Sequence, residues 1–158
     1  MSKHHFDEPN ALNDVAAFHD LFDMPILEQA QIPSKERCNL RLSLLEEELK
    51  ELRQAIEDND LTEIADALCD LQYVLSGAVL EFGLASKFKS MFDEVQRSNM
   101  SKACGTYEEA IQTQAKYLEE KQTQSEIIQK ENKFLVYRKE DGKVLKSIQY
   151  SPANLRLT

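Results

Sequence analysis

Residues 60–83, DLTEIADALCDLQYVLSGAVLEFG, contain the signals of one long amphipathic helix. Asp60 is a residue type that caps helix N-termini, and Glu63 stands where a capping-box carboxylate would sit. Gly83 is a residue type at which helices commonly end. Between these ends, apolar residues recur every three or four positions and predict one buried face: Ile64, Ala67, Leu71, Val74 and Ala78.

The neighbouring segments also have helical patterns. Pro33-Ser34 opens a helix that reaches about Asp58, with a 3-4-3-4 apolar stripe that predicts a core-facing side: Leu42, Leu45, Leu49, Leu52 and Ile56. Two shorter helices are predicted over 11–22 and 86–99, the second burying Phe88, Met91, Phe92 and Val95. We therefore predict an all-α fold, an antiparallel four-helix bundle with its core in residues 11–104.

Residues 105–158 have a different character. The stretch 107–131 is polar and helix-prone, which predicts a helical extension. After it, the apolar runs 134–137 and 144–148 flank Asp141-Gly142, a turn signal typical of a β-hairpin. The whole chain, 1–158, is expected to form a single domain made of the helical core, this extension and one small hairpin.

Composition limits the function. The chain has 158 residues with a net charge of −9, which makes duplex nucleic acid and anionic membranes poor partners. The beginning of the sequence lacks the apolar run of a signal peptide, and the three cysteines form no C-x-x-C pair. We therefore expect a cytoplasmic protein with reduced thiols.

Carboxylates line the border of the predicted buried face. Glu63, Asp66 and Asp70 lie at i, i+3 and i+7 of helix 60–83, within about a quarter of the helix circumference. In the preceding helix, Glu48 and Glu51 form an i, i+3 pair, with Glu47 one step round. If the two leucine-lined faces pack together, these carboxylates converge along one seam.

The charge balance around this seam favours a bound cation over a solvated acidic face. Between Arg53 and Lys87 the sequence has no Lys or Arg, and seven residues are acidic: Glu57, Asp58, Asp60, Glu63, Asp66, Asp70 and Glu81. Burying unpaired charges costs several kcal/mol each. Oxygen-only ligands select a hard ion, Mg²⁺ or Mn²⁺, whereas zinc, di-iron and EF-hand sites need residues that are missing here.

These residues resemble a known family. Glu47-Glu48-Leu49-Lys50-Glu51 and Glu63-Ile64-Ala65-Asp66 are similar to the E-E-x-x-E … E-x-x-D signature of the MazG-like all-α nucleotide pyrophosphohydrolases, which include phosphoribosyl-ATP pyrophosphohydrolases and dimeric dUTPases. The stretches 63–83, 94–102 and 141–146 are also similar to segments of that family. The resemblance covers about residues 34–104 and 141–146. The 11-residue spacer between Glu51 and Glu63 is shorter than usual, and 107–131 has no counterpart.

The resemblance implies a Mg²⁺-dependent enzyme, with Mn²⁺ as an alternative, that cleaves a nucleoside triphosphate to the monophosphate and pyrophosphate. The implied metal ligands are Glu48, Glu51, Glu63 and Asp66. Glu47 would be a further ligand or the base that activates water, and Asp70 a ligand or a carboxylate that positions one. Candidate phosphate and substrate contacts are Arg97, Asn99, Lys102, Lys143 and Lys146. The alternative for the cations is ordinary surface charge, and for Asn99 a helix C-cap.

Other assignments stay open. Within the same chemistry, the substrate is a (d)NTP, with dUTP or dCTP as candidates in nucleotide-pool housecleaning, or phosphoribosyl-ATP. A non-catalytic helical oligomer or adaptor is the alternative from another class, because 107–131 has an imperfect apolar stripe. With so few helices per chain, we expect a homodimer, or a dimer of dimers joined through the extension.

Overall fold

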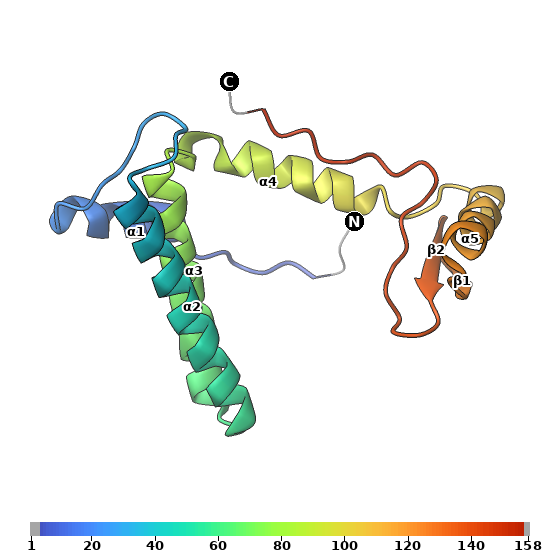
Figure 1. Cartoon of the computed structure of the whole chain (residues 1–158), viewed down its shortest axis with the longest axis horizontal. Helices are drawn as coiled ribbons and strands as arrows, with labels where there is room; N and C mark the ends of the chain where they lie inside the picture. The colour runs from blue at the N-terminus through green and yellow to red at the C-terminus, as the bar shows by residue number, and fades with distance from the viewer. Residues whose placement is uncertain (1–3, 157–158) are drawn as a thin grey trace. The chain divides into compact units, whose positions relative to one another are not determined.

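The computed structural model of the chain describes residues 4–156 and shows a mostly helical protein with one small sheet (Figure 1). The described elements are α1 (Ala11–Leu21), α2 (Lys35–Glu57), α3 (Leu61–Glu81), α4 (Ala85–Met100), α5 (Tyr107–Lys121), β1 (Ser125–Lys130) and β2 (Lys133–Arg138). The predicted helical fold with a small hairpin is confirmed. In residues 4–156, no single helix is long and apolar enough to cross a membrane.

The chain divides into two compact units after Phe88, inside α4. We call residues up to 88 unit 1 and residues from 89 onward unit 2. Unit 1 contains α1, α2 and α3, and its described part begins at residue 4. Unit 2 contains most of α4, together with α5, β1 and β2.

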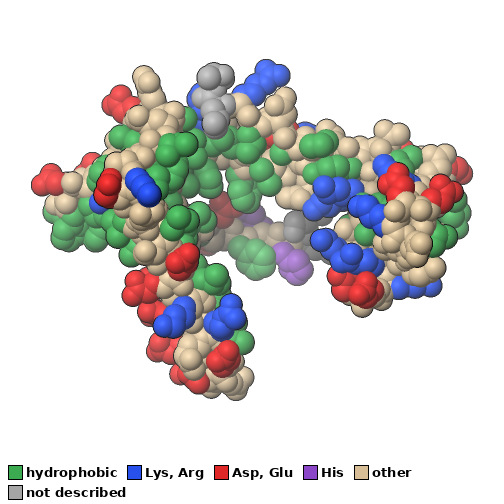
Figure 2. Space-filling model, viewed as in Figure 1, with side chains coloured by type: hydrophobic (Ala, Val, Ile, Leu, Met, Phe, Trp, Pro, Cys, Tyr) green, Lys and Arg blue, Asp and Glu red, His purple; other side chains and the backbone are tan. Residues whose placement is uncertain are grey.

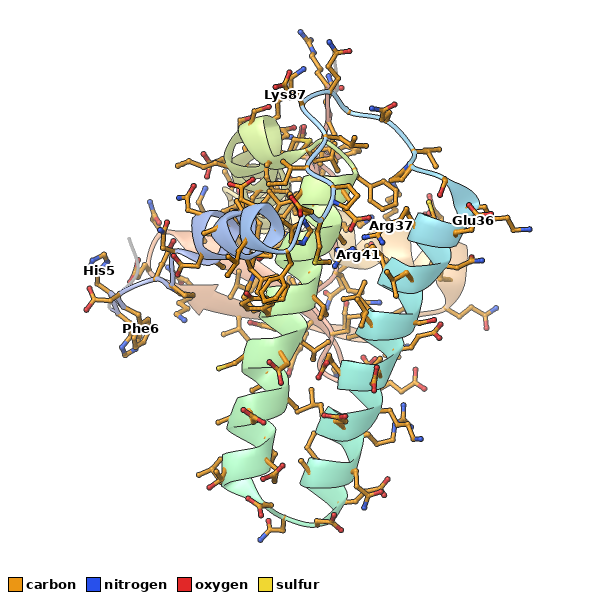
Figure 3. The ribbon with its side chains drawn as sticks, turned by 90° about the vertical axis from the view of Figure 1, so that its left-hand side faces the viewer. His5, Phe6, Glu36, Arg37, Arg41 and Lys87 are labelled. Atoms are coloured by element: carbon orange, nitrogen blue, oxygen red, sulfur yellow. The ribbon has the colours of Figure 1, made fainter. Side chains whose placement is uncertain are left out.

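An antiparallel pair of helices, α2 and α3, is the frame of unit 1 (Figures 1 and 3). Asp60 begins α3 as predicted, because its Oδ1 accepts hydrogen bonds from the N–H groups of Thr62 (2.9 Å) and Glu63 (3.1 Å). Asn59 adopts a left-handed conformation with φ of 55°, which allows the tight turn between the helices. Helix α1 packs against α3, and the turn holds the acidic ends of α2 and α3 together.

Both helices of the pair carry an apolar stripe that unit 1 leaves uncovered. On α2 the stripe is Leu42, Leu49 and Ile56, exposed by 52–58%, and on α3 it is Leu61, Leu68 and Leu75. The predicted α2 stripe is therefore wrong in part, since only Leu45 and Leu52 are half-buried. The reason is geometric: one neighbouring helix covers only part of so wide an apolar face.

A buried ionic network joins the N-terminal turns of α2 to the C-terminal turn of α3 (Figure 3). The fully buried Glu81 carboxylate accepts hydrogen bonds from Arg37 Nε (3.0 Å) and Arg41 Nε (2.9 Å), and the Nη2 groups of both arginines pair with Glu81 Oε1. Buried His19 on α1 lies beside Arg41, with 3.3 Å between Nε2 and Nη2. Arg37 and Arg41 therefore neutralise Glu81, and its inclusion among the unpaired acids is wrong. The sequence around Glu81 gives no sign of these partners because they lie 40 or more residues earlier.

Gly77 provides the space for this network. A Cβ at this position in α3 would lie 2.5 Å from Arg41 Nη1 and 3.2 Å from His19 Nε2. A side chain larger than hydrogen would therefore displace the buried guanidinium. The glycine in the middle of a helix costs about 1 kcal/mol in propensity, and here it permits the close approach of α1 and α2 to α3.

The apolar residues of α4 are less buried than predicted. Phe88 and Met91 are half-buried, whereas Phe92 and Val95 are exposed by 63% and 37%, so their predicted burial is wrong. The C-terminal tail runs along α4 in unit 2 (Figure 1). It is fixed there by hydrogen bonds from the Asn154 N–H to Glu94 Oε1 and between Ser151 and Ser101.

In unit 2, α5 packs against an antiparallel hairpin of β1 and β2. Helix α5 ends at Lys121, where Gln122 adopts a left-handed conformation with φ of 51°. The predicted helix to residue 131 is therefore too long. The predicted hairpin partner, 144–148, is also wrong, because β2 pairs with residues 125–130. Val144 makes only an isolated bridge with Tyr137. The hydrophobic core of unit 2 contains four buried residues: Cys104, Ala110, Val136 and Leu145.

Candidate functional site

The α2–α3 pair brings together carboxylates from both helices. Glu47, Glu48 and Glu51 lie on α2, and the charges that act on Glu48 from α3 are those of Asp66 and Asp70. We call these five residues the acidic seam. Figure 2 shows acidic side chains along this helix pair. Because the helices run antiparallel from the turn at Asp58–Asp60, residues near 48 on α2 lie level with residues near 70 on α3.

Glu48 is the innermost member of the seam. Its side chain is half-buried, and its Oε2 is buried with no hydrogen-bond partner among the described residues. Burial raises the pKa of Glu48, and the charges of Asp70, Glu51, Glu47 and Asp66 raise that pKa further. This carboxylate oxygen is shielded from bulk solvent and has no donor among the described residues to stabilise its charge.

This environment fits a hard divalent cation. The seam offers oxygen ligands only, the donor type that Mg²⁺ and Mn²⁺ prefer, and the orphaned oxygen of Glu48 would gain a counter-charge. In the described part of the chain, no three His, Cys, Asp or Glu side chains converge closely enough to hold an ion as they stand. Carboxylates repel one another, so we expect convergence only around a cation.

Glu63 lies outside the group that acts on Glu48. It is in the first turn of α3, one turn nearer the loop than Asp66. Its N–H donates to the capping Asp60. The structure therefore brings together five of the six acidic residues that the sequence singles out, and it places Glu63 beside them, toward the open end of the helix pair.

Comparison with known proteins identifies the family of the chain. The profile of a family described as phosphoribosyl-ATP pyrophosphohydrolase matches residues 15–99, more than half of the chain. The chain belongs to this family. The match begins in α1, contains the whole acidic seam and ends one residue before the C-terminus of α4. It leaves α5 and the hairpin outside.

A viral relative is similar over a shorter stretch. It is an uncharacterized protein of Acanthamoeba polyphaga mimivirus, 35% identical over 72 residues, which are 46% of this chain and 29% of the relative. The matched stretch thus spans less than a third of the relative's length. The description of this relative gives no activity.

The predicted phosphate and substrate contacts lie in unit 2. Lys102, Lys143 and Lys146 line one pocket of about 380 Å³. Arg97 pairs with Glu94 through two hydrogen bonds (2.7 and 2.8 Å) and also donates to the backbone carbonyls of the tail, so its guanidinium is engaged. Asn99 lies within α4, and its Oδ1 accepts a hydrogen bond from Lys102 Nζ (2.8 Å).

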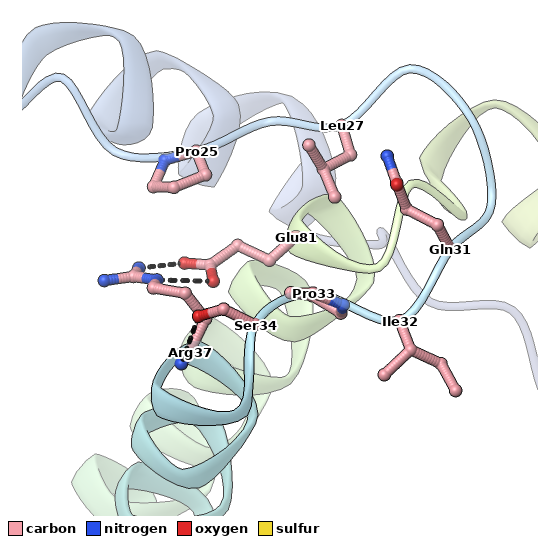
Figure 4. Close-up of a pocket in the computed structure, with 8 residues that line it drawn as sticks. All are labelled: Pro25, Leu27, Gln31, Ile32, Pro33, Ser34, Arg37 and Glu81. Atoms are coloured by element: carbon pink, nitrogen blue, oxygen red, sulfur yellow. Dashed lines mark hydrogen bonds and ion pairs between the residues drawn. The ribbon is translucent and has the colours of Figure 1, made fainter.

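A second pocket, of about 330 Å³, lies beside the ionic network in unit 1 (Figure 4). Pro25, Leu27 and Ile32 give it an apolar wall. Its charged lining residues, Arg37 and Glu81, point toward each other and form an ion pair. The pocket therefore presents mainly apolar surface, and the charges beside it serve the packing of α2 against α3.

The sequence alone did not predict the ionic network around Glu81. It also did not predict that two further basic residues, Lys121 and Arg138, line the same pocket as Lys102. Arg37 and Arg41 stand four residues apart on one face of α2, which is a signal for a shared partner. The partner, Glu81, is distant in sequence and therefore could not be assigned from spacing. Lys121 and Arg138 join the pocket of Lys102 only because α5 ends early and the chain turns back in the hairpin.

Proposed function

We propose that the chain is a Mg²⁺-dependent nucleoside triphosphate pyrophosphohydrolase that cleaves a (d)NTP to the (d)NMP and pyrophosphate. The observation that carries the proposal is the buried, unpartnered oxygen of Glu48 among four further carboxylates. A structural role for Glu48 would call for a donor, as Glu81 has in Arg37 and Arg41. Membership of the pyrophosphohydrolase family supports the same chemistry.

Each acidic residue has a proposed role. Glu48, Glu51 and Asp66 would hold Mg²⁺, with Glu63 as a further ligand from the first turn of α3. With Mg²⁺ held there, the site would neutralise polyphosphate charge and lower the pKa of a bound water. Glu47 is an exposed member of the seam on α2, where it would accept the proton of the attacking water or serve as another ligand. Asp70 acts on Glu48 from α3 and either orients it or joins the ligands.

The base and sugar of the substrate are not fixed by the seam. Carboxylates recognise the metal–polyphosphate part that all nucleoside triphosphates share, whereas discrimination between bases depends on hydrogen bonds elsewhere. We propose dUTP or dCTP as the first candidates, in a housecleaning role. Phosphoribosyl-ATP, the substrate in the family's name, requires the same α–β cleavage and belongs in any substrate panel.

We also propose that the active form is a homodimer. The uncovered stripes, Leu42-Leu49-Ile56 on α2 and Leu61-Leu68-Leu75 on α3, each repeat at seven-residue spacing. Seven-residue repeats of apolar side chains are the pattern that packs helix against helix. Two copies of the α2–α3 pair would bury both stripes and complete a four-helix bundle. A dimer of dimers through α5 is the next larger assembly.

The proposal is tested with the variant Glu48→Gln and its control Glu46→Gln, which changes an exposed carboxylate on the same helix. Glu48→Gln should lower the affinity for Mn²⁺, measured by calorimetry, at least about tenfold. It should also lower turnover by about 100-fold or more, while the helical circular dichroism stays unchanged. Turnover in Glu48→Gln equal to that in Glu46→Gln would exclude this site. A chain that binds no Mn²⁺ would favour the adaptor.

A further inference from the structure

Positive charge is concentrated in unit 2. Residues 1–88 contain 7 Lys and Arg against 18 Asp and Glu, whereas residues 89–158 contain 12 against 10. Unit 2 is therefore slightly basic in a chain whose net charge is −9. Figure 2 shows Lys and Arg side chains gathered on one face of unit 2. Of the two units, unit 2 is therefore the one whose charge is better suited to an anion.

Five of these cations line the pocket of about 380 Å³ in unit 2, which we call the basic pocket: Lys102, Lys121, Arg138, Lys143 and Lys146. All the charged residues of its lining are cationic. They come from the turn after α4, the end of α5, the end of β2 and the loop after β2. The volume equals that of roughly a dozen water molecules, which is enough for a small anion with its hydration.

Most of these charges are not neutralised by carboxylates. Lys102 Nζ donates to the neutral Asn99 amide, Lys121 Nζ lies 5.3 Å from the Tyr117 ring centroid, and Lys146 Nζ lies 4.4 Å from that of Tyr150. These contacts hold the ammonium groups in place and leave their charge intact. Arg138 differs, because Asp141 binds it at 2.7 and 2.5 Å.

The electrostatics around Tyr150 agree with this geometry. A hydrogen bond from Ser98 lowers the pKa of the Tyr150 hydroxyl, and the positive charges of Lys146 and Lys102 lower it further. Two ammonium groups from different segments thus favour negative charge at one point beside the pocket. The direction of this effect is the one that positive charge around the pocket would produce.

We propose that the basic pocket binds a phosphate-bearing anion, without a divalent metal. Ammonium groups converging on a concave site suit a compact, multiply charged oxyanion, which they contact as point charges. A nucleic-acid strand fits less well, because it calls for an extended basic groove and a stronger net positive charge. The anion site stands on the geometry of unit 2 alone. The choice of pyrophosphate as the bound anion rests on the proposed function, in which pyrophosphate is a product.

The test measures inorganic pyrophosphate binding by NMR and calorimetry in the presence of EDTA, on the full chain. Binding is expected with chemical-shift changes at Lys102, Tyr117 and the 143–146 loop. The double variant Lys143→Gln/Lys146→Gln should lower the affinity at least tenfold, whereas Lys116→Gln/Lys130→Gln, which removes the same charge outside the pocket, should change it less than twofold. The variant Glu48→Gln should bind pyrophosphate with the same affinity as the unchanged chain. Pyrophosphate binding therefore tests the basic pocket independently of the proposed hydrolase activity.

The outcomes separate the alternatives. No binding in EDTA, equal losses in the two double variants, or shift changes confined to other residues would overturn the proposal. So would a single-stranded oligonucleotide that binds more tightly than pyrophosphate and is not displaced by it. A non-hydrolysable nucleotide that competes with pyrophosphate supports the pocket as a holder of substrate phosphates, and a raised KM with unchanged kcat in the pocket variant would agree. Binding without any effect on KM supports a separate phosphate-bearing effector in the same pocket.

Discussion

At the scale of single residues, Glu48 and Glu81 show how the surroundings decide what a buried carboxylate does. Burial raises the pKa of both groups, but only Glu81 has arginines, whose hydrogen bonds and charges lower its pKa below the usual value in net terms. Around Glu48 the neighbouring charges are acidic and add to the effect of burial. Glu48 is therefore suited to binding a cation, whereas Glu81 is suited to a structural ion pair.

We predict that Glu81→Gln strongly destabilises unit 1. The substitution leaves the buried Arg41 and the partly buried Arg37 without a counter-charge, and breaking a buried pair costs about 3–5 kcal/mol. The measurement is urea unfolding followed by helical circular dichroism. Glu57→Gln, an exposed position at the end of α2, is the control and should change the free energy of unfolding by less than about 0.5 kcal/mol. Equal midpoints for both variants would contradict this role of Glu81.

The same pair should depend on pH. The pKa of Glu81 is lower in the folded chain than its ordinary value of 4.5. Its stabilising contribution is therefore fully present above pH 4.5 and is lost as the pH falls through the folded pKa. We predict that the stability difference between the unchanged chain and Glu81→Gln is constant near neutral pH and shrinks below pH 4.5. A difference that grows on acidification would contradict the sign of the shift.

Single residues were predicted unevenly from the sequence. The members of the acidic seam could be named because their i, i+3 and i+7 spacing puts them at the border of an apolar face on consecutive helices. The partners of Glu81 could not, because no local pattern connects Arg37 and Arg41 to a residue at the far end of α3. Spacing predicts neighbours on one element, whereas pairing across elements depends on how the helices pack.

At the scale of elements, the sequence predicts the helices of unit 1 closely, whereas it predicts the elements of unit 2 less well. Capping residues such as Asp60 and Ser34 mark where α3 and α2 begin, since their side chains accept hydrogen bonds from the first turn. In unit 2, Ser125–Lys130 has a polar composition that suits a helix as well as a strand. Pairing with β2 and packing on α5 decide in favour of the strand, and these are tertiary effects.

The uncovered stripe on α2 leads to a prediction about assembly. If a second copy covers the stripe, Leu42→Glu/Ile56→Glu should convert a dimer into a monomer, because it places two charges in an apolar interface. Ser43→Glu adds a charge at an exposed position of the same helix and should leave the dimer intact. Sedimentation equilibrium distinguishes the two. A monomer before any substitution, or a dimer that survives the double change, would contradict the proposed interface.

At the scale of the whole molecule, the two units carry opposite tendencies of charge. Unit 1 holds the acidic seam and most of the negative charge, and unit 2 holds the basic pocket. The residues that line the basic pocket lie beyond the stretch 15–99 that the family profile matches. Carboxylates that bind a cation and lysines that bind phosphate are the two kinds of group that hydrolysis of a nucleoside triphosphate needs.

The most direct test of the central claim is product analysis. The purified chain is incubated with Mg²⁺ and a panel of canonical and modified dNTPs plus phosphoribosyl-ATP, and pyrophosphate is separated from orthophosphate. We predict pyrophosphate and the matching monophosphate in equal amounts from at least one substrate. Release of orthophosphate, or no product from any member of the panel with either Mg²⁺ or Mn²⁺, would contradict the proposed α–β cleavage.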